Sequence, residues 1–159
     1  MTLLAAGAKA PDFTLATDTR GNIRLSDFAG KRVVLFFYPA DNTPGCTSEN
    51  CEFTGLQAGF DAEGVVLIGL SPNTVASHAG FREKYGLTPI LAADPDKVAA
   101  TAYGAWGLKK NYGKEYMGLI RSSFVVEPDG AIGQSWKVAR AAGHAQKVFD
   151  WIKANPAKA

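Results

Sequence analysis

Cys46 and Cys51 are the residues of this chain whose type and spacing offer the clearest chemistry. They are its two cysteines, and they lie five positions apart. A cysteine thiolate is a nucleophile, but an ordinary thiol has a pKa of about 8.5, so that only a small fraction of it is ionised at neutral pH. Reactivity at Cys46 therefore requires surroundings that favour the negative charge, because a buried thiol without them is inert.

The residues just before Cys46 predict such surroundings. Thr43 suits the N-cap of a helix, because its hydroxyl can accept a bond from a free backbone N–H, and Pro44 suits the first helical position. Cys46 then lies in the first turn, where free N–H groups and the positive end of the helix dipole favour a thiolate. The sequence therefore predicts a reactive sulfur at the N-terminus of a helix.

Apolar runs and turn residues predict the elements that position this helix. Continuous apolar runs at 33–38 and 64–70 are typical of strands buried on both faces, and the helix after Pro44 carries Phe53, Leu56 and Phe60 on one stripe. The other expected elements are a hairpin of strands at 13–16 and 22–25, a helical turn at 26–30, a helix capped by Asn73 and ended near Gly86, a strand at 90–91, a helix at 96–103, a polar surface loop at 107–117, strands at 121–126 and 131–136, and a helix at 143–154. Strands that alternate with helices and end in a hairpin predict an α/β fold, with a central mixed sheet flanked by helices and an N-terminal β-hairpin.

Length and composition are those of an ordinary globular protein. The chain has 159 residues, 47% of them hydrophobic, which fits one domain over 1–159 with loose ends at 1–10 and 155–159. Seventeen basic and fifteen acidic residues give a net charge of +2, too small to favour a nucleic acid or an anionic membrane as partner. Residues 1–10 do not resemble a secretory signal and no run is long enough to span a membrane, so we expect a cytoplasmic protein.

The cysteine count also bears on metal binding. Two cysteines do not make a disulfide scaffold, and they are too few for a tetrahedral zinc site without His78 and His144, which the spacing does not group with the sulfurs. We therefore expect no metal and no other cofactor. In a reducing compartment a cysteine pair is more often catalytic than structural.

The run around Cys46 resembles the active-site signature of the peroxiredoxins. Pro39, Thr43 and Cys46 have the spacing Pro-x-x-x-Thr-x-x-Cys, and the longer run 37–51 resembles the bacterioferritin-comigratory-protein, or PrxQ, branch of that family. The other matching segments lie at 11–15, 103–106, 112–114 and 121–124. The resemblance therefore spans nearly the whole chain.

This resemblance implies a thioredoxin-like fold and a thiol-dependent peroxidase that reduces hydrogen peroxide and organic hydroperoxides. It implies that Cys46 becomes a sulfenic acid, that Cys51 condenses with it to an intramolecular disulfide, and that thioredoxin or a similar dithiol restores both thiols. The branch is often monomeric, so we expect a monomer. Ala40 and Ala93 stand where the branch commonly has lysine and serine, but neither departure removes a catalytic group.

The resemblance also implies roles for residues other than the two cysteines. Thr43 and Arg121 would donate hydrogen bonds to the departing oxygen, where negative charge grows during the attack. Arg121 would further favour the Cys46 thiolate through its charge. Pro39 would shape the pocket and limit water around the sulfenic acid, and Glu49, one helical turn after Cys46, would hold the guanidinium in place.

Helix geometry adds a consequence for the two sulfurs. If Cys46 and Cys51 lie on one regular helix, their Cα atoms are about 8–9 Å apart and their side chains point about 140° apart around the axis. Disulfides rarely bridge Cα atoms more than about 7 Å apart. A Cys46–Cys51 bond therefore requires this segment to unwind, which predicts a helix in the reduced protein and melted first turns in the oxidised one.

The sequence leaves three other functions open. A thiol–disulfide oxidoreductase acting on proteins would use the same sulfur chemistry, although its usual spacing is Cys-x-x-Cys. A metal-binding or protein-interaction module would use Cys46, Cys51 and a histidine. A redox-inert domain of the same fold would hold an ordinary, protonated Cys46 thiol.

Overall fold

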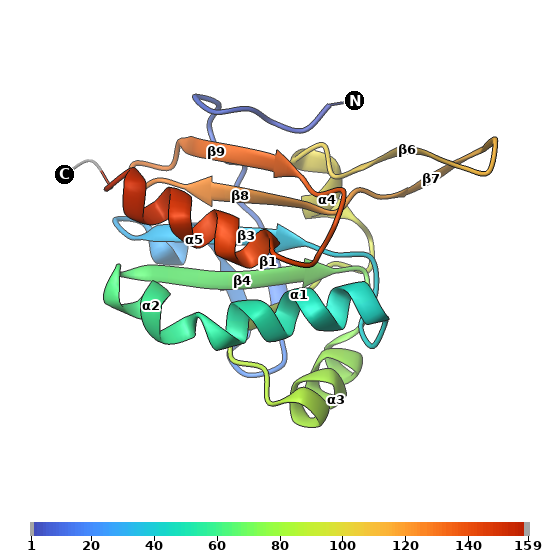
Figure 1. Cartoon of the computed structure of the whole chain (residues 1–159), viewed down its shortest axis with the longest axis horizontal. Helices are drawn as coiled ribbons and strands as arrows, with labels where there is room; N and C mark the ends of the chain where they lie inside the picture. The colour runs from blue at the N-terminus through green and yellow to red at the C-terminus, as the bar shows by residue number, and fades with distance from the viewer. Residues whose placement is uncertain (1, 158–159) are drawn as a thin grey trace.

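The structure, a computed structural model, describes residues 2–157, and its elements largely follow the predicted order (Figure 1). The strands are β1 (Thr14–Thr17), β2 (Gly21–Arg24), β3 (Arg32–Phe37), β4 (Val65–Ser71), β5 (Ile90–Ala93), β6 (Trp106–Asn111), β7 (Lys114–Leu119), β8 (Ser122–Val126) and β9 (Ile132–Lys137). The helices are the short 3-10 helix η1 (Leu25–Phe28) and the α-helices α1 (Pro44–Gly55), α2 (Gln57–Ala62), α3 (Val75–Tyr85), α4 (Val98–Ala102) and α5 (His144–Ala154).

One mixed sheet carries most of the strands. Within residues 2–157, seven strands are ordered β2-β1-β5-β4-β3-β8-β9. The neighbours β3, β4 and β5 are parallel, whereas β1 with β2 and β8 with β9 add antiparallel strands on the two sides. The predicted α/β fold, with a central mixed sheet flanked by helices and an N-terminal hairpin, is confirmed. Of the helices in the described part of the chain, none has the length and apolar character needed to cross a membrane.

Strand β3 is buried on both faces of this sheet. Alternate residues belong to two hydrophobic clusters, Val33, Leu35 and Phe37 to one and Val34, Phe36 and Tyr38 to the other. Because successive side chains of a strand point to opposite faces, a strand covered on both sides needs an unbroken apolar run. Helices α1, α2 and α5 lie together over the second cluster (Figure 1), and that cluster also contains Cys46.

The prediction of an irregular loop at 107–117 is wrong. This segment forms a separate two-stranded ribbon, β6 with β7, that projects away from the main sheet (Figure 1). Tyr112 and Gly113 at its tip have φ angles of 51° and 76°, the left-handed conformation that a two-residue hairpin turn requires. Leu108 and Met117 pair across the ribbon and both are more than half exposed, so the strands lack the burial alternation by which a sequence reveals them.

The helix after Pro44 and the helix after Asn73 also differ in detail from the prediction. The first is interrupted at Leu56, which ends α1 and precedes α2. The second is capped by Thr74 in place of Asn73, because the Thr74 hydroxyl accepts from the Ser77 N–H at 3.2 Å while the Asn73 side chain is bonded elsewhere.

The N-terminal segment is less loose than expected. The Leu4 N–H donates to Tyr103 O at 3.1 Å and the Ala10 N–H to Gly130 O at 2.9 Å, so residues 4–10 are fastened to the body of the protein. The apolar side chains of this segment pack onto the first cluster, so the segment is held in place although it has no regular secondary structure. At the other end, 155–157 are exposed, and the remaining terminal residues of the predicted loose ends, 1 and 158–159, lie outside the described part.

We predict opposite effects for the same substitution at two glycines. A Cβ at Gly69 in β4 would lie 2.8 Å from the Phe36 ring, which is itself stacked on Phe53, whereas a Cβ at exposed Gly80 in α3 has no neighbour within 4 Å. Gly69→Ala should lower the free energy of unfolding by about 1–3 kcal/mol through overpacking, and Gly80→Ala should raise it by about 0.5–1 kcal/mol. Urea unfolding measures both, and a Gly69→Ala protein as stable as wild type would contradict this packing.

Candidate active site

Cys46 lies fully buried in the first turn of α1. Thr43 occupies the N-cap and Pro44 the first helical position, as predicted. The first intrahelical bond that the described chain makes there runs from the Thr47 N–H to Thr43 O at 2.8 Å. The N–H groups of Gly45 and Cys46 precede this ladder, so they are oriented to favour a negative charge at the sulfur or on a ligand beside it.

The loop before α1 contains Thr43 and Pro39. The Thr43 hydroxyl does not cap the helix as expected but donates to Ala40 O at 2.8 Å. Since a hydroxyl has a single hydrogen, the Thr43 oxygen can accept but not donate a second bond while this one is made. The donor role predicted for Thr43 therefore does not fit this geometry. Pro39 is half-buried at the start of the loop, next to the buried Tyr38.

Arg121 brings a positive charge to Cys46 from the short connection between β7 and β8. Its Nη2 donates to Cys46 Sγ at 3.2 Å, and its Nη1 donates to Glu49 Oε1 at 2.6 Å. Burial works against the charge of the guanidinium, but Glu49 and the Cys46 sulfur outweigh it and raise the pKa of Arg121. A Cβ at Gly45 would lie 3.2 Å from the same Nη2, so the absence of a side chain there makes room for the guanidinium.

Glu49 lies under the guanidinium and is itself completely buried. Burial raises the pKa of Glu49 to about 7, although the charge and the hydrogen bond of Arg121 pull it down. The short ion pair shows that Arg121 can stabilise the carboxylate, and the loss of solvation shows why it does so incompletely. Glu49 therefore titrates near neutral pH, where the protein would work.

The first half of α1 also buries polar atoms at a cost. Thr47 Oγ1, Glu49 Oε2 and Asn50 Oδ1 are buried and find no hydrogen-bond partner among the described residues. A buried polar atom without a partner costs about 1–3 kcal/mol. This part of the helix is therefore less stable than its regular geometry suggests.

Cys51 lies on the same helix as Cys46 but on its solvent side. Cys51 is exposed, Cys46 is buried with Phe53, and both cysteines are free thiols. This is the difference in faces that the helical spacing predicts. The structure thus brings Cys46, Arg121 and Glu49 into direct contact, and leaves Cys51 separate from them.

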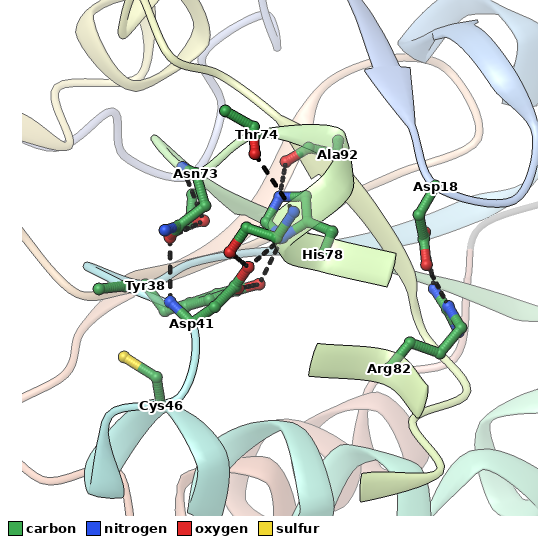
Figure 2. Close-up of polar contacts among 12 residues, drawn as sticks. Asp18, Tyr38, Asp41, Cys46, Asn73, Thr74, His78, Arg82 and Ala92 are labelled. Carbon is green, nitrogen blue, oxygen red and sulfur yellow. Dashed lines mark hydrogen bonds and ion pairs between the residues drawn. The ribbon is translucent and has the colours of Figure 1, made fainter. Parts of the chain in front are cut away.

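A second polar cluster beside the loop was missed by the sequence analysis (Figure 2). Asp41 accepts a hydrogen bond from the Tyr38 hydroxyl at 2.7 Å and pairs with His78 Nδ1 at 2.8 Å. Asp41 and His78 are 37 positions apart, so no local motif connects them. The only sequence signal was an aspartate in the loop that follows a buried strand, where side chains gather at the carboxyl edge of a sheet.

The two histidines considered as zinc ligands have other partners. His144 Nε2 pairs with Ser123 Oγ at 2.8 Å, and burial, assisted by the charges of Lys147 and Arg121, lowers the pKa of His144 to about 4. His78 is bound to Asp41. Among residues 2–157, no group of three or more histidine, cysteine, aspartate or glutamate side chains is arranged to hold a metal ion.

This chain is similar in sequence and in fold to proteins that are already known. Residues 6–135 match the profile of the AhpC/TSA family. Peroxiredoxin Bcp of Bacillus subtilis is 40% identical over 147 residues, which cover 92% of this chain and 94% of that protein. A structure of Xanthomonas campestris peroxiredoxin Q matches with a TM-score of 0.89 and 35% identity, over 95% of this chain and 98% of that one.

A second structure from Xanthomonas campestris concerns alkyl peroxide reduction by its bacterioferritin comigratory protein. It matches with a TM-score of 0.88 and 35% identity, over 94% of this chain and 98% of that one. Likenesses of this extent confirm that the mixed sheet and its helices form the thioredoxin-like fold expected from the sequence. The chain belongs to the AhpC/TSA family and is a peroxiredoxin of the bacterioferritin-comigratory-protein, or PrxQ, branch.

Proposed function

We propose that Cys46 is the peroxidatic cysteine of a thiol peroxidase that reduces hydrogen peroxide and organic hydroperoxides. The observation that carries this proposal is the Arg121 guanidinium at 3.2 Å from Cys46 Sγ, at the N-terminus of α1. The cation and the free N–H groups favour the thiolate, which is the attacking form of the sulfur. They also favour the negative charge that develops on the departing oxygen. The alkyl peroxide reduction reported for the Xanthomonas campestris relative supports the organic substrates.

The first step transfers one oxygen from the peroxide to sulfur. The S–O bond forms as the O–O bond breaks, and the bonding electron pair leaves with the second oxygen, which takes a proton from water. Cys46 is oxidised by two electrons to a sulfenic acid, and the peroxide is reduced by the same two electrons. Arg121 donates to the departing oxygen while the Thr43 oxygen accepts from the peroxide O–H. Glu49 positions the guanidinium, and Pro39 limits the access of water.

Cys51 resolves the sulfenic acid. Its thiol condenses with Cys46, forming the S–S bond and releasing water, and an external dithiol then reduces the disulfide. We propose thioredoxin or a similar protein dithiol as this reductant and the cytoplasm as the compartment, with the enzyme acting as a monomer. The exposure of Cys51 supports its role, because a resolving sulfur must be free to move toward its partner.

The resolving step requires the first turns of α1 to unwind. About 8–9 Å separates the two Cα atoms on a regular helix, which is beyond the reach of a disulfide. Unwinding costs a few backbone hydrogen bonds at about 1 kcal/mol each, but it also hydrates the three buried oxygens that lack partners. The interruption at Leu56 separates this change from α2, which can remain folded.

Single-turnover kinetics with hydrogen peroxide tests the two sulfurs. Cys46→Ser should not consume peroxide, because the nucleophile is gone. Cys51→Ser should react once at close to the wild-type rate and then stall until a small thiol is added. Stopped-flow measurement of peroxide loss distinguishes these behaviours, and a Cys46→Ser protein with wild-type turnover would rule out the proposal.

Amide hydrogen exchange tests the unwinding. Residues 45–52 should lose protection in the disulfide form relative to the reduced form, because their helical hydrogen bonds are broken. Residues 57–62 in α2 serve as the internal control and should be protected equally in both forms. Equal protection of residues 45–52 in the two forms would mean that the disulfide forms without unwinding or does not form.

The pH dependence of stability tests the environment of Glu49. Its pKa in the folded protein, about 7, lies above the 4.5 of a free side chain, so its stabilising effect is complete below about pH 4.5 and is lost as the pH rises through about 7. The unfolding free energy of wild type relative to Glu49→Gln should therefore fall between these values, by at most about 1.4 kcal/mol per pH unit. The matched control Glu63→Gln, at an exposed site, should leave the pH dependence of the unfolding free energy unchanged in this range. If the difference in unfolding free energy between wild type and Glu49→Gln did not depend on pH, the proposed titration of Glu49 would be contradicted.

A further inference from the structure

Asp41 is a buried acidic residue that the proposed peroxide chemistry does not use. It lies in the loop between β3 and α1, five positions before Cys46, and 1% of its side chain is exposed. Its carboxylate accepts from the Tyr38 hydroxyl and the Ser77 hydroxyl, both at 2.7 Å. Its backbone N–H donates to Asn73 Oδ1 at 2.9 Å. This single loop residue is therefore bonded to Tyr38 directly after β3, to the start of α3 and to the turn before α3.

Asp41 also forms a buried pair with His78. Its Nδ1 lies 2.8 Å from Asp41 Oδ2, and its Nε2 lies 3.0 Å from Ala92 O in β5. The carbonyl can only accept, so Nε2 carries a hydrogen. Burial works against the charge of Asp41, but the hydrogen bonds from His78 and Tyr38 outweigh it and lower the pKa of Asp41. The Asp41 carboxylate therefore faces Nδ1 as an acceptor, while Nε2 of the same ring is bonded to Ala92 O.

This pair lies next to the reactive sulfur without touching it (Figure 2). Tyr38, which donates to the same carboxylate that His78 contacts, belongs to the same buried cluster as Cys46 and Phe53. Asn42, directly after Asp41, has a φ of 64°, a left-handed conformation that non-glycine residues adopt rarely and that surrounding contacts must hold. The loop that leads into Cys46 is thus fastened at Asp41 to elements outside the proposed active site.

We propose that Asp41 and His78 are positioning residues for the reaction of Cys46. The pair fixes the loop from 38 to 43, and through it the Thr43 oxygen and the N-terminus of α1, in the arrangement that holds a peroxide against the sulfur. This inference rests on the proposed function, since it assumes that Cys46 attacks a peroxide. It goes beyond that function by placing control of the site in α3 and β5, whose residues contribute nothing to the signature around Cys46.

The physical reason is the cost of an unpaired buried charge. If His78 is replaced, Asp41 retains a negative charge that has lost its buried partner in a dry site. The loop can relieve this by moving Asp41 toward water, which displaces Thr43 and the first turn of α1. Misplacement of reacting groups by about 1 Å reduces rates by about 100-fold, so even a small shift is measurable.

Helix α3 provides a matched control. One turn beyond His78, Arg82 forms an ion pair with Asp18, whose side chain is 1% exposed. Arg82 also donates to Leu87 O and Pro89 O at 2.6 Å, so this pair fastens the other end of α3. Asp18 lies in the turn between β1 and β2, and among the described residues it makes no hydrogen bond or ion pair with the loop before Cys46 (Figure 2). Breaking the Arg82–Asp18 ion pair therefore removes a buried charged partner from the same helix and leaves the loop before Cys46 unchanged.

The experiment compares His78→Gln, Asp41→Asn, the double variant and Asp18→Asn, all with Cys51→Ser so that Cys46 is the one thiol. Two rates are measured from pH 5 to 9: single-turnover reduction of hydrogen peroxide and alkylation by iodoacetamide. His78→Gln should slow peroxide reduction by about 10- to 100-fold without slowing alkylation, because alkylation needs an accessible thiolate but no placed oxygen donors and acceptors. The double variant should recover part of the peroxide rate, because it leaves no unpaired charge. Asp18→Asn should stay within about twofold of the parent protein, even with a comparable loss in Tm.

Each outcome decides the inference. Peroxide rates for His78→Gln and Asp41→Asn that match Asp18→Asn at equal Tm loss would reduce the pair to a structural role and overturn the proposal. Equal slowing of both reactions would show that the pair acts on the ionisation of Cys46 and not on positioning, which also overturns it. If His78→Gln does not fold, Asp41→Asn and the double variant supply the same comparison. A parent protein that is alkylated but does not reduce peroxide would instead overturn the proposed function, and this inference with it.

Discussion

The guanidinium of Arg121, shared between the Cys46 sulfur and the Glu49 carboxyl, is the interaction on which this site depends. Its position follows from the order of strands in the sheet. Strand β3 pairs with the antiparallel β8, and Phe37 at the end of β3 is paired with Ser122 at the start of β8. The residue before Ser122 and the loop after Phe37 therefore lie at the same edge, which is why a cation 75 positions away in sequence meets Cys46. The missing side chain at Gly45 leaves the space in which the contact is made.

Helix α1 has to meet two opposed requirements. As a regular helix it points free N–H groups at Cys46, and for the proposed disulfide it must open. Its first half buries one oxygen each of Thr47, Glu49 and Asn50 without a hydrogen-bond partner among the described residues, so this half is less stable than the length of the helix suggests. Two polar pairs hold its N-terminal end: Glu49 of the helix with the partly buried Arg121, and Asp41 of the preceding loop with His78 of α3. Buried pairs often add little net stability, which makes geometry the more natural reason for them here.

Much of this arrangement could be predicted from the sequence, and the exceptions share a cause. The buried runs that became β3 and β4 and the start of α1 at Thr43 and Pro44 are local patterns with a direct physical reason, although the Thr43 hydroxyl itself bonds to Ala40 O in place of capping the helix. Arg121 could be named only through a family resemblance, because neither strand's sequence alone predicts how β3 and β8 are aligned. The pair of Asp41 and His78 has no local signal for the same reason.

The β6–β7 ribbon escaped prediction for a different reason. Its exposed pair of Leu108 and Met117 shows no alternation, and Tyr112 occupies a turn position where asparagine, aspartate or glycine is usual. A sequence pattern identifies a strand or a hairpin when burial of one face or the requirements of the turn restrict which residues can occur there. Outside its base, where Leu119 and Trp106 pack on the first cluster, the ribbon is mostly exposed. Its turn also uses an untypical residue, so neither burial nor turn chemistry marks it in the sequence.

The unequal exposure of the two sulfurs gives the proposed disulfide a direction. Cys51 already faces water, whereas Cys46 is buried in the cluster that contains Phe53 and is bonded to the Arg121 guanidinium. In the proposed cycle, a bulky protein thiol would meet the outer sulfur first and make its mixed disulfide there. Cys46 would then be expelled as the leaving group, and the Arg121 guanidinium would stabilise it as an anion on its return to the folded site, which favours the step because thiols that depart as stabilised anions depart fastest. Reduction would thus be coupled to refolding of the helix, and the step that regenerates the nucleophile would also restore the starting geometry.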